Sequence, residues 1–204
     1  MNVVFDFGGV LLRWAPQEFM PRLLPGRATD AAAVQALIDD FFEGFQGDWG
    51  RFDSGLLDAA QLASLIAKRT GIALADVQRV IPAVAAELQP LPEVVQILDS
   101  LRERGHRLWF LSNMPASYAD AIDGANPIGS WFEGGLYSSR VRLRKPAAEI
   151  FKLLAERFDL DPAKSLFVDD SAHNIEAAQA LGWQTLHFRD PAQCRAELVR
   201  RGVL

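Results

Sequence analysis

From Glu93 onwards the chain alternates between helical and extended patterns, and this alternation is its strongest constraint on the fold. Apolar residues recur at helical spacing in several segments, and short apolar runs with strand character lie between them. Parallel strands need crossover connections, which are usually helices, so repeated units of this kind predict a parallel sheet with helices on both faces. The expected helices are 94–101, 150–158, 174–181 and 191–201, and the expected strands are 107–111, 165–168 and 183–188.

The first strand is separated from this alternating part by a long segment without strand character. Val3–Phe5 is a short apolar run, which predicts a buried strand of the same sheet. Residues from about Pro16 to Gln89 have Ala-rich stretches with helical spacing, interrupted by Gly and Pro, and predict four or so helices. Gln89–Pro92 is typical of a linker. The sequence therefore predicts an α/β core, residues 1–15 and 90–204, with an all-helical insert, residues 16–89.

The composition is that of an ordinary globular protein, and together with the length and charge it excludes several other classes of protein. A length of 204 residues predicts one domain, or one domain with an insert. The formal net charge of −5 argues against a dedicated nucleic-acid binder, which would be basic. Cys194 is the single cysteine, so neither an intrachain disulfide nor a cysteine metal cluster can form. Since no apolar run is long enough for a transmembrane helix and the N-terminus lacks a secretory signal, we expect a cytoplasmic protein without membrane or nucleic-acid partners.

Polar residues stand at the points where the expected strands end. Asp6 follows the first strand, Ser112–Asn113 the second and Asp169–Asp170 a later one, while Lys145 stands just before a helix. Ligands bind at the carboxyl ends of the strands in an open parallel sheet, so we expect these side chains to meet. Three carboxylates repel one another unless a cation lies among them, and oxygen ligands favour a hard ion such as Mg²⁺. A lysine and a serine beside that ion suit an anionic substrate.

The same residues, in their order along the chain, resemble the four motifs of the haloacid dehalogenase-like hydrolase superfamily. The motifs are Phe5-Asp6-Phe7-Gly8-Gly9-Val10-Leu11, Leu111-Ser112-Asn113, Lys145-Pro146 and Val168-Asp169-Asp170-Ser171. They bracket nearly the whole chain, and the helical insert resembles the small cap domain of that superfamily. The resemblance implies a Rossmann-like core with an inserted helical cap domain. The first and last motifs are most similar to those of the glucose-1-phosphatase-like branch, which acts on small sugar phosphates.

The resemblance implies a phosphatase mechanism that begins at Asp6. Its carboxylate would attack phosphorus and form an aspartyl-phosphate intermediate. Ser112 and the backbone of Asn113 would donate hydrogen bonds to the phosphoryl oxygens, while Lys145 would hold the phosphate and offset the charge of Asp6. The substrate would be a small-molecule phosphate ester, and the enzyme a monomer or a homodimer.

The resemblance also implies a bound Mg²⁺ ion. Its protein ligands would be Asp6, the backbone carbonyl of Gly8 and Asp170. Asp169 would support the metal directly or through water, and Asn174, one helical turn after Asp170, would orient the water ligands.

One position departs from the pattern of the superfamily. Most of its phosphatases have a second aspartate, a general acid and base, where this chain has Gly8. The loss of such a group typically costs about 10²–10⁴ in rate, and an anomeric sugar oxygen is a leaving group that tolerates the loss. Gly8 also leaves two other interpretations open. One is a metal-independent 2-haloacid dehalogenase, which would leave the Asp169–Asp170 pair without a counter-ion, and the other is a non-catalytic binding protein on a hydrolase scaffold.

The insert contains an aromatic-rich stretch, which we interpret mainly as its own hydrophobic core. These residues are Trp14, Phe41, Phe42, Phe45, Trp49 and Phe52. Gly44, Gly47 and Gly50 lie among them and predict a flexible loop able to close on substrate. Asp48 and Asp53 are then candidates for contacts with sugar hydroxyls.

Overall fold

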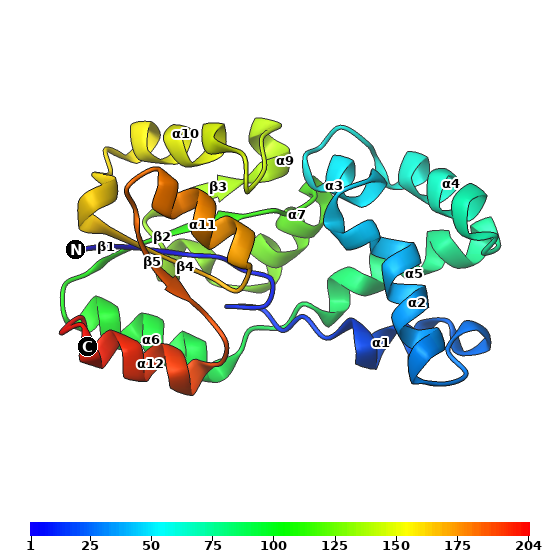
Figure 1. The fold of residues 1–204 in the computed structure, drawn as a ribbon, viewed down its shortest axis with the longest axis horizontal. Coiled ribbons are helices and arrows are strands. Elements are labelled where there is room, and N and C mark those ends of the chain that lie inside the picture. Colours follow the sequence, from blue (N-terminus) through cyan, green and yellow to red (C-terminus); the bar gives the residue numbers. More distant parts are fainter.

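The computed structural model describes residues 1–204, without the side chain of Phe45. Its strands are β1 (Asn2–Phe5), β2 (Arg107–Ser112), β3 (Gly134–Tyr137), β4 (Ser165–Asp169) and β5 (Gln184–His187). They form one sheet in the order β3-β2-β1-β4-β5, and all neighbouring pairs are parallel (Figure 1). The central strand β1 pairs Phe5 with Phe110 of β2 on one side and with Val168 of β4 on the other. The carboxyl ends of these three strands therefore lie next to one another.

Helices make up most of the remaining chain. Those between β1 and β2 are α1 (Pro16–Leu23), α2 (Ala31–Phe42), α3 (Asp48–Asp53), α4 (Ala59–Thr70), α5 (Leu74–Glu87) and α6 (Pro92–Glu103). Those after β2 are α7 (Ala116–Ala125), α8 (Ile128–Trp131), α9 (Ser138–Val141), α10 (Ala148–Phe158), α11 (Ala172–Ala180) and α12 (Pro191–Arg200). Short 3₁₀ segments are η1 (Pro25–Arg27), η2 (Glu43–Phe45) and η3 (Pro162–Lys164).

Each face of the sheet has its own buried core, because successive strand residues point to opposite faces. On one face Val4, Trp109 and Phe167 pack with side chains of α10 and α11. On the other face Val3 and Phe5 pack with side chains of α6 and α12. Figure 1 shows α10 and α11 above the sheet and α6 and α12 below it. The prediction of an α/β fold with a parallel sheet covered on both faces is confirmed.

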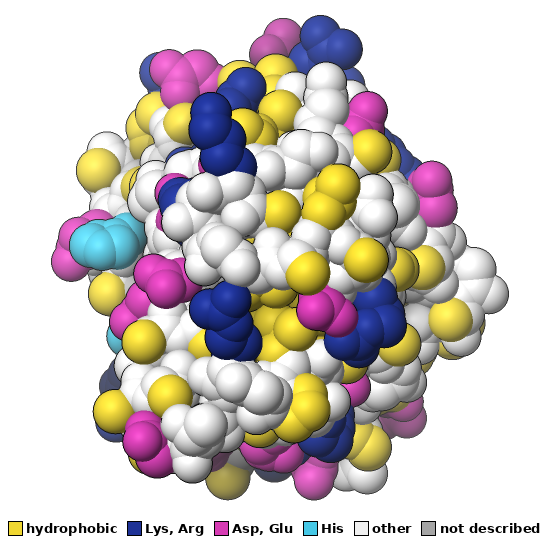
Figure 2. Space-filling view, turned by 90° about the vertical axis from the view of Figure 1, so that its right-hand side faces the viewer, with side chains coloured by type: hydrophobic (Ala, Val, Ile, Leu, Met, Phe, Trp, Pro, Cys, Tyr) yellow, Lys and Arg dark blue, Asp and Glu magenta, His cyan; other side chains and the backbone are white. Residues whose placement is uncertain are grey.

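Residues 16–89, called the helical insert below, contain helices and turns without a strand, and their buried side chains continue the core of one sheet face. The segments that enter and leave the insert are paired through their backbones. Arg13 N donates to Gln89 O at 2.8 Å, and Leu91 N donates to Leu11 O at 2.8 Å. Figure 2 shows the outer end of the insert, where positive and negative side chains are interspersed with hydrophobic ones.

Local sequence signals set the ends of several helices. Asp58 and Gln61 form a capping box at the start of α4, and Gly71 ends that helix in the left-handed conformation with φ 66°. Asp190 caps α12, which begins with Pro191. These helices therefore begin and end where short-range chemistry requires.

The boundaries of the strands and of the core helices that the sequence predicted agree with the structure to within about two residues, but β3 and the helices α7, α8 and α9 were missed. β3 begins with Gly134-Gly135, residues that disfavour a strand on propensity. A Cβ atom on Gly135 would lie 2.4 Å from the Phe110 side chain, and one on Gly134 would lie 2.8 Å from the Phe158 ring. Glycine is needed because these rings cover the strand, and such a contact between distant residues leaves no local signal.

The helices of the insert, and the apolar character of all the helices, can be compared with what the sequence predicted. The insert has five α-helices where four or so were expected, and its division from the core at residues 15/16 and 89/90 stays a prediction. No described helix combines the length and the apolar character needed to cross a membrane.

Candidate active site

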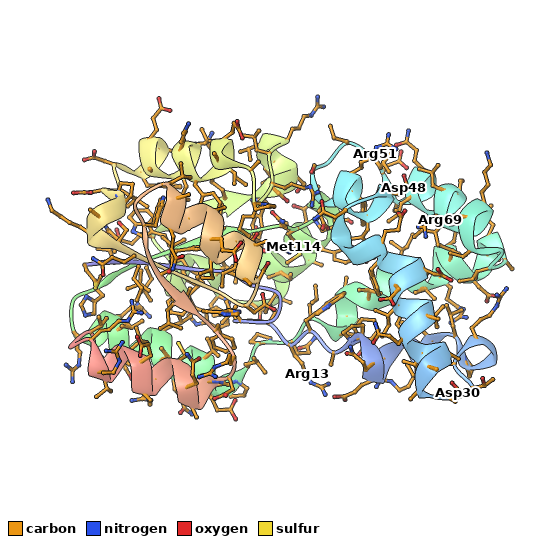
Figure 3. The ribbon with its side chains drawn as sticks, in the orientation of Figure 1. Arg13, Asp30, Asp48, Arg51, Arg69 and Met114 are labelled. Atoms are coloured by element: carbon orange, nitrogen blue, oxygen red, sulfur yellow. The ribbon has the colours of Figure 1, made fainter. Side chains whose placement is uncertain are left out.

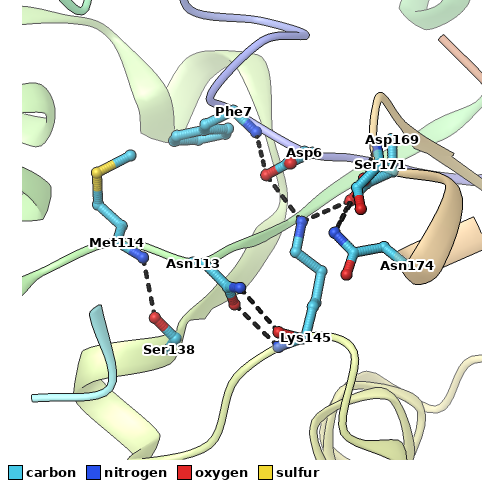
Figure 4. A network of polar contacts seen from close by, with 9 residues as sticks. All are labelled: Asp6, Phe7, Asn113, Met114, Ser138, Lys145, Asp169, Ser171 and Asn174. Carbon is cyan, nitrogen blue, oxygen red and sulfur yellow. Dashed lines mark hydrogen bonds and ion pairs between the residues drawn. The ribbon is translucent and has the colours of Figure 1, made fainter. Parts of the chain in front are cut away.

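Three carboxylates and one lysine meet at the carboxyl ends of the central strands. Asp6 follows β1, while Asp169 ends β4 and is followed by Asp170. One oxygen from each of the three lies within 4.8 Å of the others. Lys145, in the loop before α10, places its Nζ 2.9 Å from Asp6 Oδ1 and 2.6 Å from Asp169 Oδ2 (Figure 4). Lys145 and Asp169 are fully buried, Asp6 is nearly so, and Asp170 is exposed.

Asp169 is held by the protein through both of its oxygens. Besides Lys145, its carboxylate accepts a hydrogen bond from Ser171 N at 2.8 Å and from Asn174 Nδ2 at 3.0 and 3.1 Å. Asp169 therefore positions Lys145 and Asn174. The Asn174 side-chain amide donates to Asp169, and its expected role in orienting the water ligands of a metal stays a prediction.

The cluster carries more negative than positive charge. Burial raises the pKa of Asp6 well above its ordinary value, Lys145 opposes that rise, and Asp169 and Asp170 add to it. Asp170 as a whole residue is exposed, but its carboxyl is partly enclosed beside Gly9; this partial burial, followed by the charge of Asp169, raises its pKa. Burial by itself would lower the pKa of Lys145, but Asp169 and Asp6 outweigh that effect and raise it, so the side chain is an ammonium. Three carboxylates facing one ammonium fit a hard divalent cation, which prefers oxygen ligands.

The loop after β2 is tied directly to Lys145. Asn113 Nδ2 donates to Lys145 O at 2.9 Å, and Lys145 N donates to Asn113 Oδ1 at 2.9 Å (Figure 4). This positioning role of the Asn113 side chain was not predicted, because the sequence pointed only to its backbone. Ser112 Oγ is buried and has no hydrogen-bond partner, which is costly for a hydroxyl and leaves it available to a ligand.

A turn with one essential glycine lies between β1 and the insert. Gly9 has φ 76°, and a Cβ atom there would lie 2.2 Å from Asp170 Oδ2. The missing side chain thus lets Asp170 approach the segment that follows Asp6. The sequence showed Gly9 as part of a strand end and a motif, but the contact with Asp170 depends on the pairing of β1 with β4.

The cluster opens into a pocket of about 290 Å³ between the core and the helical insert. The core contributes Asp6, Asn113, Met114, Lys145 and Asp170 to its wall. Figure 3 places Met114 between the core and α3. From the insert and the segments beside it come Trp14, Trp49, Asp53 and Leu88, and α7 adds Tyr118. The pocket therefore joins a charged end to an aromatic wall.

The comparisons with known proteins give the family. A family model of haloacid dehalogenase-like hydrolases matches residues 1–182. The chain belongs to this family.

Relatives of this hydrolase include named phosphatases. The sesquiterpene phosphatase astK of Aspergillus oryzae is 24% identical over 196 residues, which cover 96% of this chain and 93% of that protein. The phosphoglycolate phosphatase of Escherichia coli is 32% identical over 91 residues, covering 45% of this chain and 36% of that protein. Among solved structures, the HAD family enzyme bt-2542 from Bacteroides thetaiotaomicron, in complex with magnesium and inorganic phosphate, has a TM-score of 0.73 and 25% identity, covering 92% of this chain and 93% of that one.

The insert of this hydrolase differs in part from what its sequence suggested. Asp53 lines the pocket, whereas Asp48 forms ion pairs with Arg51 at 3.3 Å and with Arg69 at 4.0 Å (Figure 3). Trp14 and Trp49 contribute to the pocket wall in addition to packing against other rings.

The three glycines of the insert do not lie in one continuous loop. Gly50 is buried inside α3 and Gly47 precedes its first residue, so a flexible loop over all three glycines was wrong. Gly44 alone of the three lines the pocket. The start of α3 at Asp48 explains the difference, because the helix includes Gly50 and leaves Gly44 and Gly47 before it.

Proposed function

We propose that the chain is a Mg²⁺-dependent phosphatase that hydrolyses a small phosphate monoester through an aspartyl-phosphate intermediate. The observation that carries this proposal is the cluster of Asp6, Asp169 and Asp170 around Lys145, at one end of a pocket. The phosphatase names of two relatives and the magnesium and phosphate in the bt-2542 complex support it.

The metal would be held by Asp6, the backbone carbonyl of Gly8 and Asp170, with Asp169 behind them. When bound, Mg²⁺ supplies positive charge that stabilises the phosphoryl oxygens and lowers the pKa of the nearby carboxyls. Asp169 serves this site mainly by fixing Lys145, since both of its oxygens accept protein hydrogen bonds. The helical insert would be the cap that closes the pocket.

The chemistry proceeds in two steps at Asp6. Its carboxylate attacks phosphorus, an O–P bond forms and the bond to the ester oxygen breaks, and the departing oxygen takes a proton from water and leaves as the alcohol. Water then attacks the acyl phosphate, which releases inorganic phosphate and regenerates the carboxylate. Lys145, which already contacts Asp6, balances charge on the phosphoryl group, and Ser112 Oγ and Asn113 N donate to its oxygens.

The substrate is expected to be small. A pocket of about 290 Å³ lies at the lower end of the range for ligand sites, and one side of it must accommodate the phosphoryl group. Gly8 provides no acid to protonate the departing oxygen, so a good leaving group is favoured. By this leaving-group argument alone, the first substrate class to test is a sugar phosphate whose ester oxygen is anomeric.

Phosphate release from a panel of esters, with Mg²⁺ and with a chelator, tests the proposal. We expect release that requires Mg²⁺ and is abolished by Asp6→Asn, with an unchanged circular-dichroism spectrum. Halide release from a 2-haloacid in the presence of chelator would instead support the dehalogenase interpretation. Binding of phosphate without turnover of any ester would support a non-catalytic scaffold.

A further inference from the structure

Asp53 is a buried carboxylate in the pocket wall that the proposed chemistry does not use. It ends α3, is 5% exposed and lines the pocket together with Trp49 and Tyr118. No group that the structure describes donates a hydrogen bond to its carboxylate. The one charge that acts on it appreciably is Arg144, which also lines the pocket and donates to Gln46 Oε1 at 2.7 Å. Asp53 lines the pocket, so a ligand that enters there can supply a donor to its carboxylate.

The backbone of Asp53 is anchored to the phosphate-binding side of the core. Ser138, which is fully buried, donates its hydroxyl hydrogen to Asp53 O and accepts a hydrogen bond from Met114 N at 2.9 Å (Figure 4). Met114 directly follows Asn113, the residue that holds Lys145. Gly55 adds a close approach on the same side, since a Cβ atom there would lie 2.7 Å from Ser139 O. Asp53 thus has a fixed place relative to the catalytic cluster.

The surroundings of Asp53 restrict what a ligand there can be. Trp14, Trp49 and Leu88 present apolar surface to the pocket. Tyr118 donates its hydroxyl hydrogen to Ile81 O, so it offers mainly its ring. A sugar has a hydroxyl on nearly every carbon, and the hydroxyls that face Trp14, Trp49 and Leu88 would find no partner there.

We propose that Asp53 is a specificity-determining residue that accepts a hydrogen bond from one hydroxyl of an otherwise largely apolar leaving group. This inference rests on the proposed phosphatase function. In place of the sugar phosphate that the leaving-group argument alone puts first, it assigns the monophosphate of an apolar diol as the substrate class. A neutral hydroxyl is favoured over an ammonium, because the Arg144 guanidinium already places a positive charge near the carboxylate. Burial raises the pKa of Asp53 to about 7, and a hydroxyl donor would offset the cost of its ionised form.

Matched pairs of esters test the proposal. The kcat/KM of butanediol and hexanediol monophosphates is compared with that of butyl and hexyl phosphates, and aminohexyl and hexose phosphates are included. A hydrogen bond to a charged group corresponds to a factor of about 10 to 100 in affinity. We therefore expect the kcat/KM of each diol ester to exceed that of its alkyl partner by about this factor, mainly because KM is lower. Asp53→Leu keeps the branched shape but removes the acceptor, and it is expected to abolish the preference. Asp48→Leu makes the same change in the same helix outside the pocket and should retain it.

Three results would overturn the role of Asp53. The first is a diol preference that is unchanged in Asp53→Leu. The second is an equal loss of kcat on every ester in that variant, which would place Asp53 in the chemical step. The third is a preference of the wild type for the aminohexyl or hexose esters. Failure of the wild type to hydrolyse any ester would refute the phosphatase function instead. In that case, calorimetric titration with hydroxyhexyl and hexyl phosphonates measures the binding preference due to Asp53 without any need for turnover. A binding preference for the hydroxylated phosphonate in the wild type that Asp53→Leu lacks supports the proposal, and equal binding of the two overturns it.

Discussion

The buried carboxylate of Asp53 makes a quantitative prediction about stability and pH. Burial raises its pKa from 3.8 to about 7, although Arg144 lowers it in part. Below about pH 4 the carboxyl is protonated in both the folded and the unfolded chain. Between about pH 4 and 7 only the unfolded chain loses the proton, so the free energy of unfolding falls by about 1.36 kcal/mol per pH unit. Above about pH 7 both states are ionised and the loss, about 4 kcal/mol in total, stays constant.

Asp53→Asn removes this titration while keeping the shape of the side chain. The stability of the variant relative to the wild type is therefore expected to rise by about 3 kcal/mol between about pH 5 and pH 8, and then to level off. Urea denaturation at several pH values measures it, and the other titrating groups cancel because both proteins contain them. Asp48→Asn removes an aspartate from the same helix without changing the pocket wall, and it serves as the control. If the difference in stability between Asp53→Asn and the wild type were the same at about pH 5 and pH 8, the raised pKa of Asp53 would be refuted.

Three other substitutions test residues at the charged end of the pocket. Gly9→Ala places a methyl group 2.2 Å from Asp170 Oδ2 at φ 76°, and should destabilise the fold by about 1–3 kcal/mol and weaken Mg²⁺ binding, as read by thermal melts and metal titration of activity. Asn113→Ala removes the two hydrogen bonds that hold Lys145 and should lower kcat by about tenfold or more with little change in melting temperature, and unchanged kinetics would argue against this positioning role. Gly8→Asp meets no atom within 4 Å of its new Cβ and should raise kcat for alkyl phosphates by up to about 10²-fold, with a smaller gain for nitrophenyl phosphate, whose leaving group needs no acid.

Much of the proposed catalytic cluster could be predicted from where the strands end in the sequence. Asp6 and Asp169–Asp170 each come at the end of a short apolar run, and parallel strands bring their carboxyl ends to one edge. Lys145 lies in a loop, so its place depends on the side chain of Asn113 and the carboxylate of Asp169. Local patterning predicts which residues carry charge at this edge, but it does not predict which of them hold the others in place.

The sequence by itself determined the local elements and the chemistry of the strand ends. Helical periodicity, capping residues and apolar runs depend on neighbours a few positions away. They predicted four of the strands and most of the helices, but not α7, α8 and α9. Only the tertiary structure decided the rest. β3 is a strand because Phe110 and Phe158 cover its glycines, and Asp53 is a pocket residue because Ser138 joins it to Met114. These features arise from contacts between residues far apart in the chain, whose energies exist only once the sheet and the insert have packed together.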